Sequence, residues 1–151
     1  MYKKILVPLD GSEFSECILE HVKAIATGCQ VPEVVLLRVV EPVREIYWMG
    51  EDWRRDAEVK TKAMAQDYLS KLADKLKQEG MAVNFAVVDG KPVGEILNYA
   101  SNNQVDLIAM STHGESGISR FALGSVTDRV IRHSTAPLLL VSPPGCRNIL
   151  V

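Results

Sequence analysis

Five short apolar segments, separated by segments with helical periodicity, constrain the fold of this chain most strongly. The apolar segments are 4–9, 34–40, 82–88, 105–110 and 138–141. The first is apolar on both faces, which is typical of a central strand in a parallel sheet. Strands that alternate with helices along a whole chain predict an α/β domain. We therefore expect a single doubly wound, Rossmann-like domain over residues 1–151, with a five-stranded parallel sheet and helices on both faces.

Residues that favour helix ends set the bounds of the intervening helices. The expected helices run from Ser12 to Gly28, from about 52 to 79, from Pro92 past 100, and from Ser125 to His133. Ser12 is a good N-cap, Pro92 suits a first helical turn, and Gly80 closes the long helix. Ser125 and Asp128 together fit a capping box at the start of the last helix.

The composition narrows the classes of function. Of the 151 residues, 47% are apolar and 24% are charged, as in ordinary globular domains. The formal net charge of −2 lacks the basic footprint of nucleic-acid binders. No apolar run approaches the roughly 18 residues that span a membrane, and the N-terminus lacks a signal-peptide pattern. We expect a cytoplasmic protein that binds neither nucleic acid nor membrane.

The cysteines carry no functional pattern. Cys17, Cys29 and Cys146 form no CxxC pair, and their spacing fits no zinc site. Cys17 lies on an apolar helical stripe, so we expect it to be a buried, unreactive thiol.

The stretch from Met110 to Ser125 carries the strongest functional signal. A hydrophobic strand ends in small and polar residues, nine residues separate Gly114 from Gly124, and a helical pattern follows at once. A strand that leads through a small-residue loop into a helix N-terminus binds phosphate, because free N–H groups and the helix dipole point at the anion. Glycine lets the backbone approach such a ligand closely. This segment is predicted to be a nucleotide-phosphate loop.

Other candidate residues converge on the same edge of the expected sheet. In doubly wound sheets, ligands bind beyond the carboxyl ends of the strands, where the strand order reverses. Asp10 ends the first strand, the strand that includes Val39 ends nearby, and the 110–125 loop follows the fourth strand. Spacing alone favours a plain strand-to-helix turn at residues 10–12, in which Ser12 caps the helix.

The chain resembles the universal stress protein family nearly from end to end. The resemblance rests on KKILVPLDGS at 3–12, LLRVVEP at 36–42, VDGKP at 88–92, MSTHGESG at 110–117 and LGSV at 123–126. The ATP-binding branch of that family carries Gly, two residues, Gly, nine residues, Gly, then Ser or Thr. Gly114, Gly124 and Ser125 match this pattern, whereas Ser111 stands in place of its first glycine.

The resemblance implies an adenine nucleotide, ATP or its relatives AMP and ADP. Pro8 and Leu9 would line the adenine or ribose pocket, and Asp10 would face the nucleotide. Val39 would supply backbone hydrogen bonds to the adenine edge, and Met110 and Ser111 would border the ribose. The phosphates would be held by main-chain N–H groups and two hydroxyls of Gly114, Gly124, Ser125, Val126 and Thr127. Mg²⁺ or Mn²⁺ would bridge the phosphates, since the loop contains no lysine.

The family resemblance also implies a homodimer that pairs through its last strand, here 138–141. The implied function is a sensor or regulatory module of the stress response with a protein partner that the sequence does not identify. It would work by ordering segments 41–53 and 111–124 around the ligand. Two alternatives stay open: a slow ATPase or phosphotransferase in the same pocket, and a dimeric interaction protein without nucleotide. The common catalytic nucleotide and hydrolase motifs are missing.

Several residues near these segments have more than one interpretation. Trp48, Met49 and Trp53 form an apolar cluster in an irregular segment. This cluster is compatible with a lid over the site, a surface for a partner, or local packing under a loop. His113 has no carboxylate partner at readable spacing, so we expect a structural or exposed role. Arg120 lies in the loop, where reaching a phosphate and facing solvent are equally compatible with its position.

Overall fold

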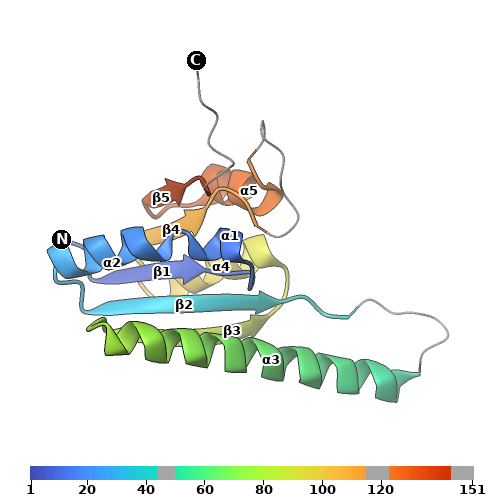
Figure 1. Cartoon of the computed structure of the whole chain (residues 1–151). Helices are drawn as coiled ribbons and strands as arrows, with labels where there is room; N and C mark the ends of the chain where they lie inside the picture. Colours follow the sequence, from blue (N-terminus) through green and yellow to red (C-terminus); the bar gives the residue numbers. More distant parts are fainter. Residues whose placement is uncertain (44–49, 115–122, 144–151) are drawn as a thin grey trace.

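In the described part of the computed structural model, residues 1–43, 50–114 and 123–143, five parallel strands form one sheet (Figure 1). They are β1 (Lys4–Pro8), β2 (Glu33–Val40), β3 (Val83–Asp89), β4 (Leu107–Ser111) and β5 (Leu138–Val141). The strand order is β3-β2-β1-β4-β5, and every neighbouring pair is parallel. β1, in which Ile5, Leu6 and Val7 are fully buried, lies at the centre, as its apolar character on both faces predicts.

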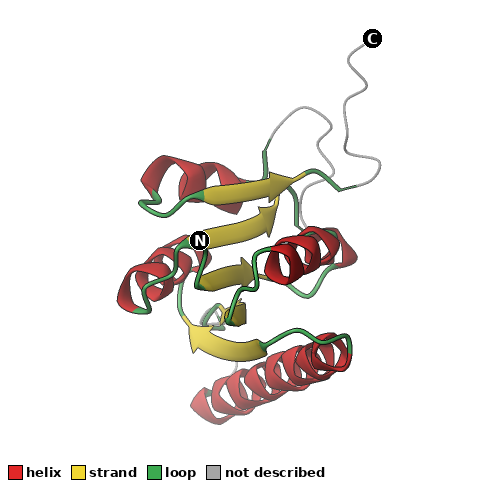
Figure 2. Ribbon diagram, turned by 90° about the vertical axis from the view of Figure 1, so that its left-hand side faces the viewer, coloured by secondary structure: helices red, strands yellow, loops and turns green. Residues whose placement is uncertain are grey.

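Helices cover both faces of this sheet (Figure 2). They are α1 (Glu13–Glu16), α2 (Leu19–Gly28), α3 (Glu51–Gln78), α4 (Pro92–Asn102) and α5 (Ser125–His133). One hydrophobic cluster joins α2 and α3 to one face, and a second joins α4 and α5 to the other. The predicted doubly wound α/β architecture is therefore confirmed. Among the described helices, none is long and apolar enough to cross a membrane.

The order of the strands places one crevice at the carboxyl edge of the sheet. After β1 the chain enters α1 and α2 on one face, whereas after β4 it leads to α5 on the other. Because β1 and β4 are neighbours, their connections part to opposite faces, which leaves an opening between them.

The first expected helix is divided into two. Ser12 caps α1 as predicted, but α1 ends at Glu16 and α2 starts at Leu19. The hydroxyl of Ser15 donates a hydrogen bond of 2.9 Å to the carbonyl oxygen of Ser12, which competes with regular helical bonding. The prediction that Cys17 is buried is wrong, because Cys17 is half-buried. Its sulfur lies 3.6 Å from Ser111 Oγ.

Helix α3 has two halves with different surroundings. Its buried residues are Ala65, Leu69, Ala73 and Leu76, all in the second half. The first half has no buried residue and extends past the end of the sheet (Figure 1). Trp53 belongs to the first turn of α3 rather than to an irregular segment, and 44% of its surface is exposed. Trp48, Met49, Arg120 and Cys146 lie outside the described residues.

We predict that Leu69→Ala lowers the free energy of unfolding by about 2–5 kcal/mol, because it leaves a cavity under α3. Leu69 is fully buried, whereas Met64 on the same helix is 64% exposed. Met64→Ala is the matched control and should change the stability by less than about 0.5 kcal/mol. Urea denaturation of the two variants measures both effects. Equal losses of unfolding free energy in the two variants would contradict the packing of α3 on the sheet.

Candidate functional site

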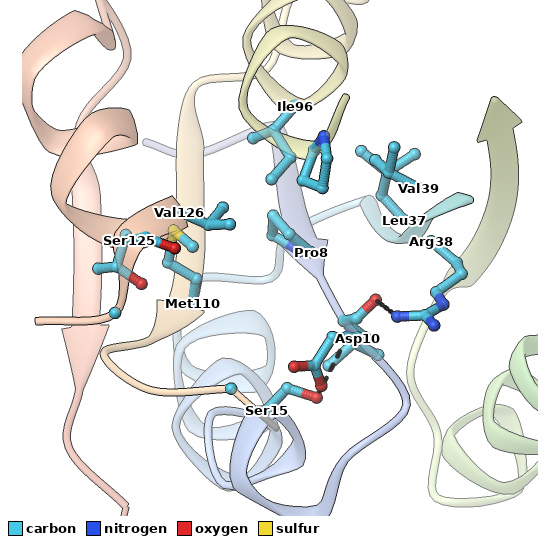
Figure 3. Close-up of a pocket in the computed structure, with 15 residues that line it drawn as sticks. Pro8, Asp10, Ser15, Leu37, Arg38, Val39, Ile96, Met110, Ser125 and Val126 are labelled. Atoms are coloured by element: carbon cyan, nitrogen blue, oxygen red, sulfur yellow. Dashed lines mark hydrogen bonds between the residues drawn. The ribbon is translucent and has the colours of Figure 1, made fainter. Parts of the chain in front are cut away.

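A cavity opens at the carboxyl ends of β1, β2 and β4, beside the first turns of α4 and α5 (Figure 3). All the residues that the sequence assigned to a nucleotide site, except Ser111, line this cavity. The lining residues are Pro8, Leu9, Asp10, Ser15, Leu37, Arg38, Val39, Pro92, Ile96, Met110, Gly114, Gly124, Ser125, Val126 and Thr127. The fold thus brings together segments that are more than a hundred residues apart in the chain.

Local hydrogen bonds orient the carboxylate of Asp10 at this cavity. Its Oδ1 atom accepts hydrogen bonds from the N–H of Ser12 at 2.9 Å and from the hydroxyl of Ser12 at 2.6 Å. The N–H of Asp10 donates a longer bond of 3.4 Å to the hydroxyl of Ser15. Ser12 caps α1 at the same time. Ser12 is therefore the helix cap that the turn interpretation expects, and Asp10 lines the cavity.

Gly114 is the residue that lets the β4 loop approach Asp10. A Cβ atom built at position 114 would collide with the Oδ2 atom of Asp10. Without a Cβ atom, Gly114 leaves room for the Asp10 carboxylate in this position, so the loop after β4 and the turn after β1 approach each other. This contact gives a physical reason for glycine at the second position of the sequence motif.

The start of α5 differs from the predicted capping box. Gly124 is the N-cap, Ser125 is the first helical residue, and its side chain makes no capping bond. The N–H of Gly124 donates to the carbonyl oxygen of Thr112 at 2.8 Å, which fixes the start of the helix. The carboxylate of Asp128 instead accepts bonds of 3.0 and 3.2 Å from Arg132. The helix covers the expected residues 125–133, but the capping-box prediction is wrong, because Gly124 rather than Ser125 is the N-cap.

The N–H groups in the first turn of α5 face the cavity without an acceptor inside the helix. The first regular bond of α5 runs from Asp128 N to Gly124 O, at 2.9 Å. The N–H groups of residues 125–127 therefore precede the helical bonding pattern, and all three residues line the cavity. The positive end of the α5 dipole lies at the same place. This end of the cavity suits an anion.

Hydrogen bonds of Ser111 and Thr127 hold the start of α5 against the end of β4. The hydroxyl of buried Thr127 donates a bond of 3.0 Å to the carbonyl oxygen of Ser111, joining α5 to the end of β4. Ser111 is buried, and its hydroxyl oxygen accepts a bond of 3.3 Å from the N–H of His113. Ser111 does not line the cavity, and its hydroxyl oxygen lies 3.6 Å from the sulfur of Cys17. Its place beside a ribose stays a prediction.

His113 is buried and does not line the cavity, and its Nδ1 lies 2.8 Å from the hydroxyl oxygen of Thr112. This placement agrees with the structural role expected for it. In the described part of the chain, no group of three or more His, Cys, Asp or Glu side chains is placed to hold a metal ion.

The model of the universal stress protein family, described under that name, matches residues 1–142. The chain belongs to the universal stress protein family. The universal stress protein MJ0577 of Methanocaldococcus jannaschii is 34% identical over 155 residues, covering 93% of this chain and 95% of that protein. A solved structure of MJ0577 superposes with a TM-score of 0.85 at 37% identity, over 98% of this chain and 99% of that one.

Two more distant members of the family have been solved with nucleotides. One is an Arabidopsis thaliana family protein with AMP bound, at 19% identity and a TM-score of 0.67, covering 93% of this chain and 92% of that one. The other is a universal stress protein in complex with cAMP, at 23% identity and a TM-score of 0.69, covering 93% and 97%. At these identities the likeness shows the shared fold.

The family motif does not include every residue that lines the cavity in this member. The sequence analysis missed Ser15, Leu37, Arg38, Pro92 and Ile96. Arg38 had a readable signal, because it is the one charge inside the apolar segment 34–40. Its guanidinium donates a long bond of 3.5 Å to the carbonyl oxygen of Leu9, and it is the only cation among the described lining residues (Figure 3).

We predict that Gly114→Ala lowers the free energy of unfolding by about 1–3 kcal/mol, as overpacking does. The added methyl group must displace the Asp10 carboxylate from its position. Gly94→Ala is the matched control, since a Cβ atom there meets no atom within 4 Å. In helix α4 that change should raise the stability by up to about 1 kcal/mol. Urea denaturation that found both variants equally stable would contradict the contact between Gly114 and Asp10.

Proposed function

We propose that this universal stress protein binds an adenine nucleotide, with ATP as the first candidate and AMP or ADP as related ligands. The observation that carries the proposal is the two-ended cavity. One end is an apolar slot between the sheet and α4, and the other is the first turn of α5 with its free N–H groups. A purine base and a phosphate chain have these two chemistries at their two ends.

The base would occupy the apolar end. Pro8, Val39, Ile96 and Met110 provide the hydrophobic lining there, and Leu9 lies beside them. The backbone of Val39, at the end of β2, would hydrogen-bond to the adenine edge. The Asp10 carboxylate would face the nucleotide and accept hydrogen bonds from ribose hydroxyls, since a carboxylate is a strong acceptor.

The phosphates would lie against the start of α5. The N–H groups of Ser125, Val126 and Thr127 and the hydroxyl of Ser125 would donate to phosphate oxygens. The Thr127 hydroxyl already donates to Ser111, so Thr127 would contribute its N–H group. Gly114 and Gly124 would let the backbone come close. Mg²⁺ or Mn²⁺ would enter with the phosphates, whose oxygen atoms are the ligands that such cations prefer.

Two further observations support nucleotide binding. Ser111 replaces the first glycine of the family motif, but its side chain packs behind the cavity and leaves the ligand space open. Members of the family with the same fold have been solved with AMP and with cAMP, so this architecture accommodates adenine nucleotides in those proteins. The physiological role we propose is a sensor or regulatory module whose contacts with a protein partner change on nucleotide binding.

We predict that ATP with Mg²⁺ binds nucleotide-free protein with micromolar affinity, about −8 kcal/mol, in calorimetric titration. Gly124→Val should weaken binding about tenfold or more, equal to 1.4 kcal/mol or more. A Cβ atom at position 124 lies 3.0 Å from the backbone oxygen of Thr112, so valine must push the start of α5 out of place.

Gly94→Val is the control for this titration, because the position is open and outside the cavity. It should bind ATP as the unmodified protein does. The proposal is overturned if neither ATP nor AMP releases or takes up heat at millimolar concentration. It is equally overturned if the two glycine variants bind with the same affinity.

We also propose that the protein forms a homodimer through β5. This strand is an edge of the sheet in the described chain, with only β4 beside it. Its four residues, Leu138–Val141, are all apolar and half-buried. An apolar edge strand left open invites association, and pairing with a second copy would cover it.

Leu140→Pro should turn the dimer into a monomer. The carbonyl oxygens of Pro137 and Val141 accept bonds from β4, so the alternate residues 138 and 140 direct their backbone groups to the open edge. Proline at 140 removes an edge N–H and leaves the ladder with β4 intact. Sedimentation equilibrium measures the mass of both proteins. A monomeric unmodified protein, or a dimeric variant, would contradict the proposed interface.

A further inference from the structure

We propose that Tyr68 of α3 is a positioning residue for the nucleotide site, which acts on Asp10 through Glu16 and helix α1. This inference rests on the proposed nucleotide binding and adds a route by which α3 and the site influence each other. Tyr68 does not line the cavity. Three consecutive steps connect Tyr68 to the cavity.

The first contact joins α3 to α1. The hydroxyl of Tyr68 donates a hydrogen bond of 2.7 Å to the Oε1 atom of Glu16. Tyr68 and Glu16 are 52 residues apart in the sequence, and both are half-buried. Burial raises the pKa of Tyr68, and the hydrogen bond to Glu16 raises that pKa further. The phenol therefore stays protonated at physiological pH and remains a donor to the carboxylate.

The second step runs along α1, a helix of only four residues. A single helical turn has no stability of its own, so its position depends on what holds it. Ser12, the N-cap of α1, bonds to Asp10, and Glu16, the last residue of α1, bonds to Tyr68. Cys17, directly after α1, touches Ser111 at the end of β4.

The third contact is between α1 and the cavity. Ser15 of α1 accepts a hydrogen bond from the N–H of Asp10, and both residues line the cavity. The Asp10 carboxylate also fills the space beside Gly114. A shift of α1 must therefore move the carboxylate that we propose faces the nucleotide.

Helix α3 and Asp10 also line a second cleft together. This cleft is lined by Asp10, Gly11, Ser12, Arg38, Val40, Thr61, Met64, Ala65 and Tyr68. Asp10 and Arg38 thus belong to both the nucleotide cavity and this cleft. The first half of α3, which begins at Glu51, has no buried residue and is accessible to a partner. By thermodynamic reciprocity, a nucleotide that favours one position of α1 also favours one position of α3.

The test is a set of calorimetric titrations of ATP with Mg²⁺ into full-length variants. Tyr68→Phe removes only the hydroxyl and should weaken binding about fivefold, the low end of typical coupling between sites. Glu16→Ala should weaken it equally, and the double variant should be no weaker than either single one. Glu16→Gln keeps an acceptor oxygen for Tyr68 and should restore affinity close to that of the unmodified protein.

Tyr99→Phe is the matched control. Tyr99 is half-buried on α4 and does not line the cavity, and its hydroxyl makes no hydrogen bond with the described residues. It should leave ATP affinity unchanged. A thermal melt of each variant identifies any that fails to fold, and Glu16→Gln then carries the comparison with Glu16→Ala.

Unchanged affinity in Tyr68→Phe would overturn the inference while the proposed nucleotide binding stands. Additive losses in the double variant would overturn it as well, because the two residues would then act independently. Absence of binding by the unmodified protein would overturn the proposed function and this inference together. The titration of the unmodified protein therefore separates the two failures.

Discussion

The parallel pairing of β1 with β4 is the constraint on which the site depends. Parallel strands end at the same edge, and the connections after these two strands go to opposite faces of the sheet. The opening between them receives Asp10 from one strand end and Gly114 from the loop after the other. These residues approach so closely that a Cβ atom at position 114 would collide with the Asp10 carboxylate. The cavity is thus a consequence of strand order, and a few local contacts give it its shape.

Strand pattern and glycine spacing predicted the sheet and the edge at which the cavity opens, whereas the family resemblance supplied residues such as Pro8, Leu9, Val126 and Thr127. Apolar segments that are buried on both faces have few alternatives to a parallel sheet, so the central position of β1 followed from Ile5–Val7 alone. Topology then placed the strand ends together. The same reasoning missed Pro92 and Ile96, because a helix pattern indicates which residues face inward but not which of them border an opening.

The remaining errors share a cause, which is tertiary contact. Spacing favoured Ser125 as the N-cap, but the N-cap is Gly124, whose N–H bonds to the carbonyl oxygen of Thr112. Spacing also assigned Cys17 to one continuous helical stripe, whereas the thiol meets Ser111, 94 residues away in the sequence. No local propensity contains such contacts. Arg38 differs from these cases, since a lone charge inside an apolar strand was visible and was not used.

The most direct test of the account is a crystal structure of this chain grown with ATP and Mg²⁺. The account predicts adenine between Pro8 and Ile96 near the backbone of Val39, with phosphate oxygens within hydrogen-bonding distance of the N–H groups of residues 125–127. A nucleotide bound elsewhere on the molecule would contradict it. So would a cavity without nucleotide at saturating ATP.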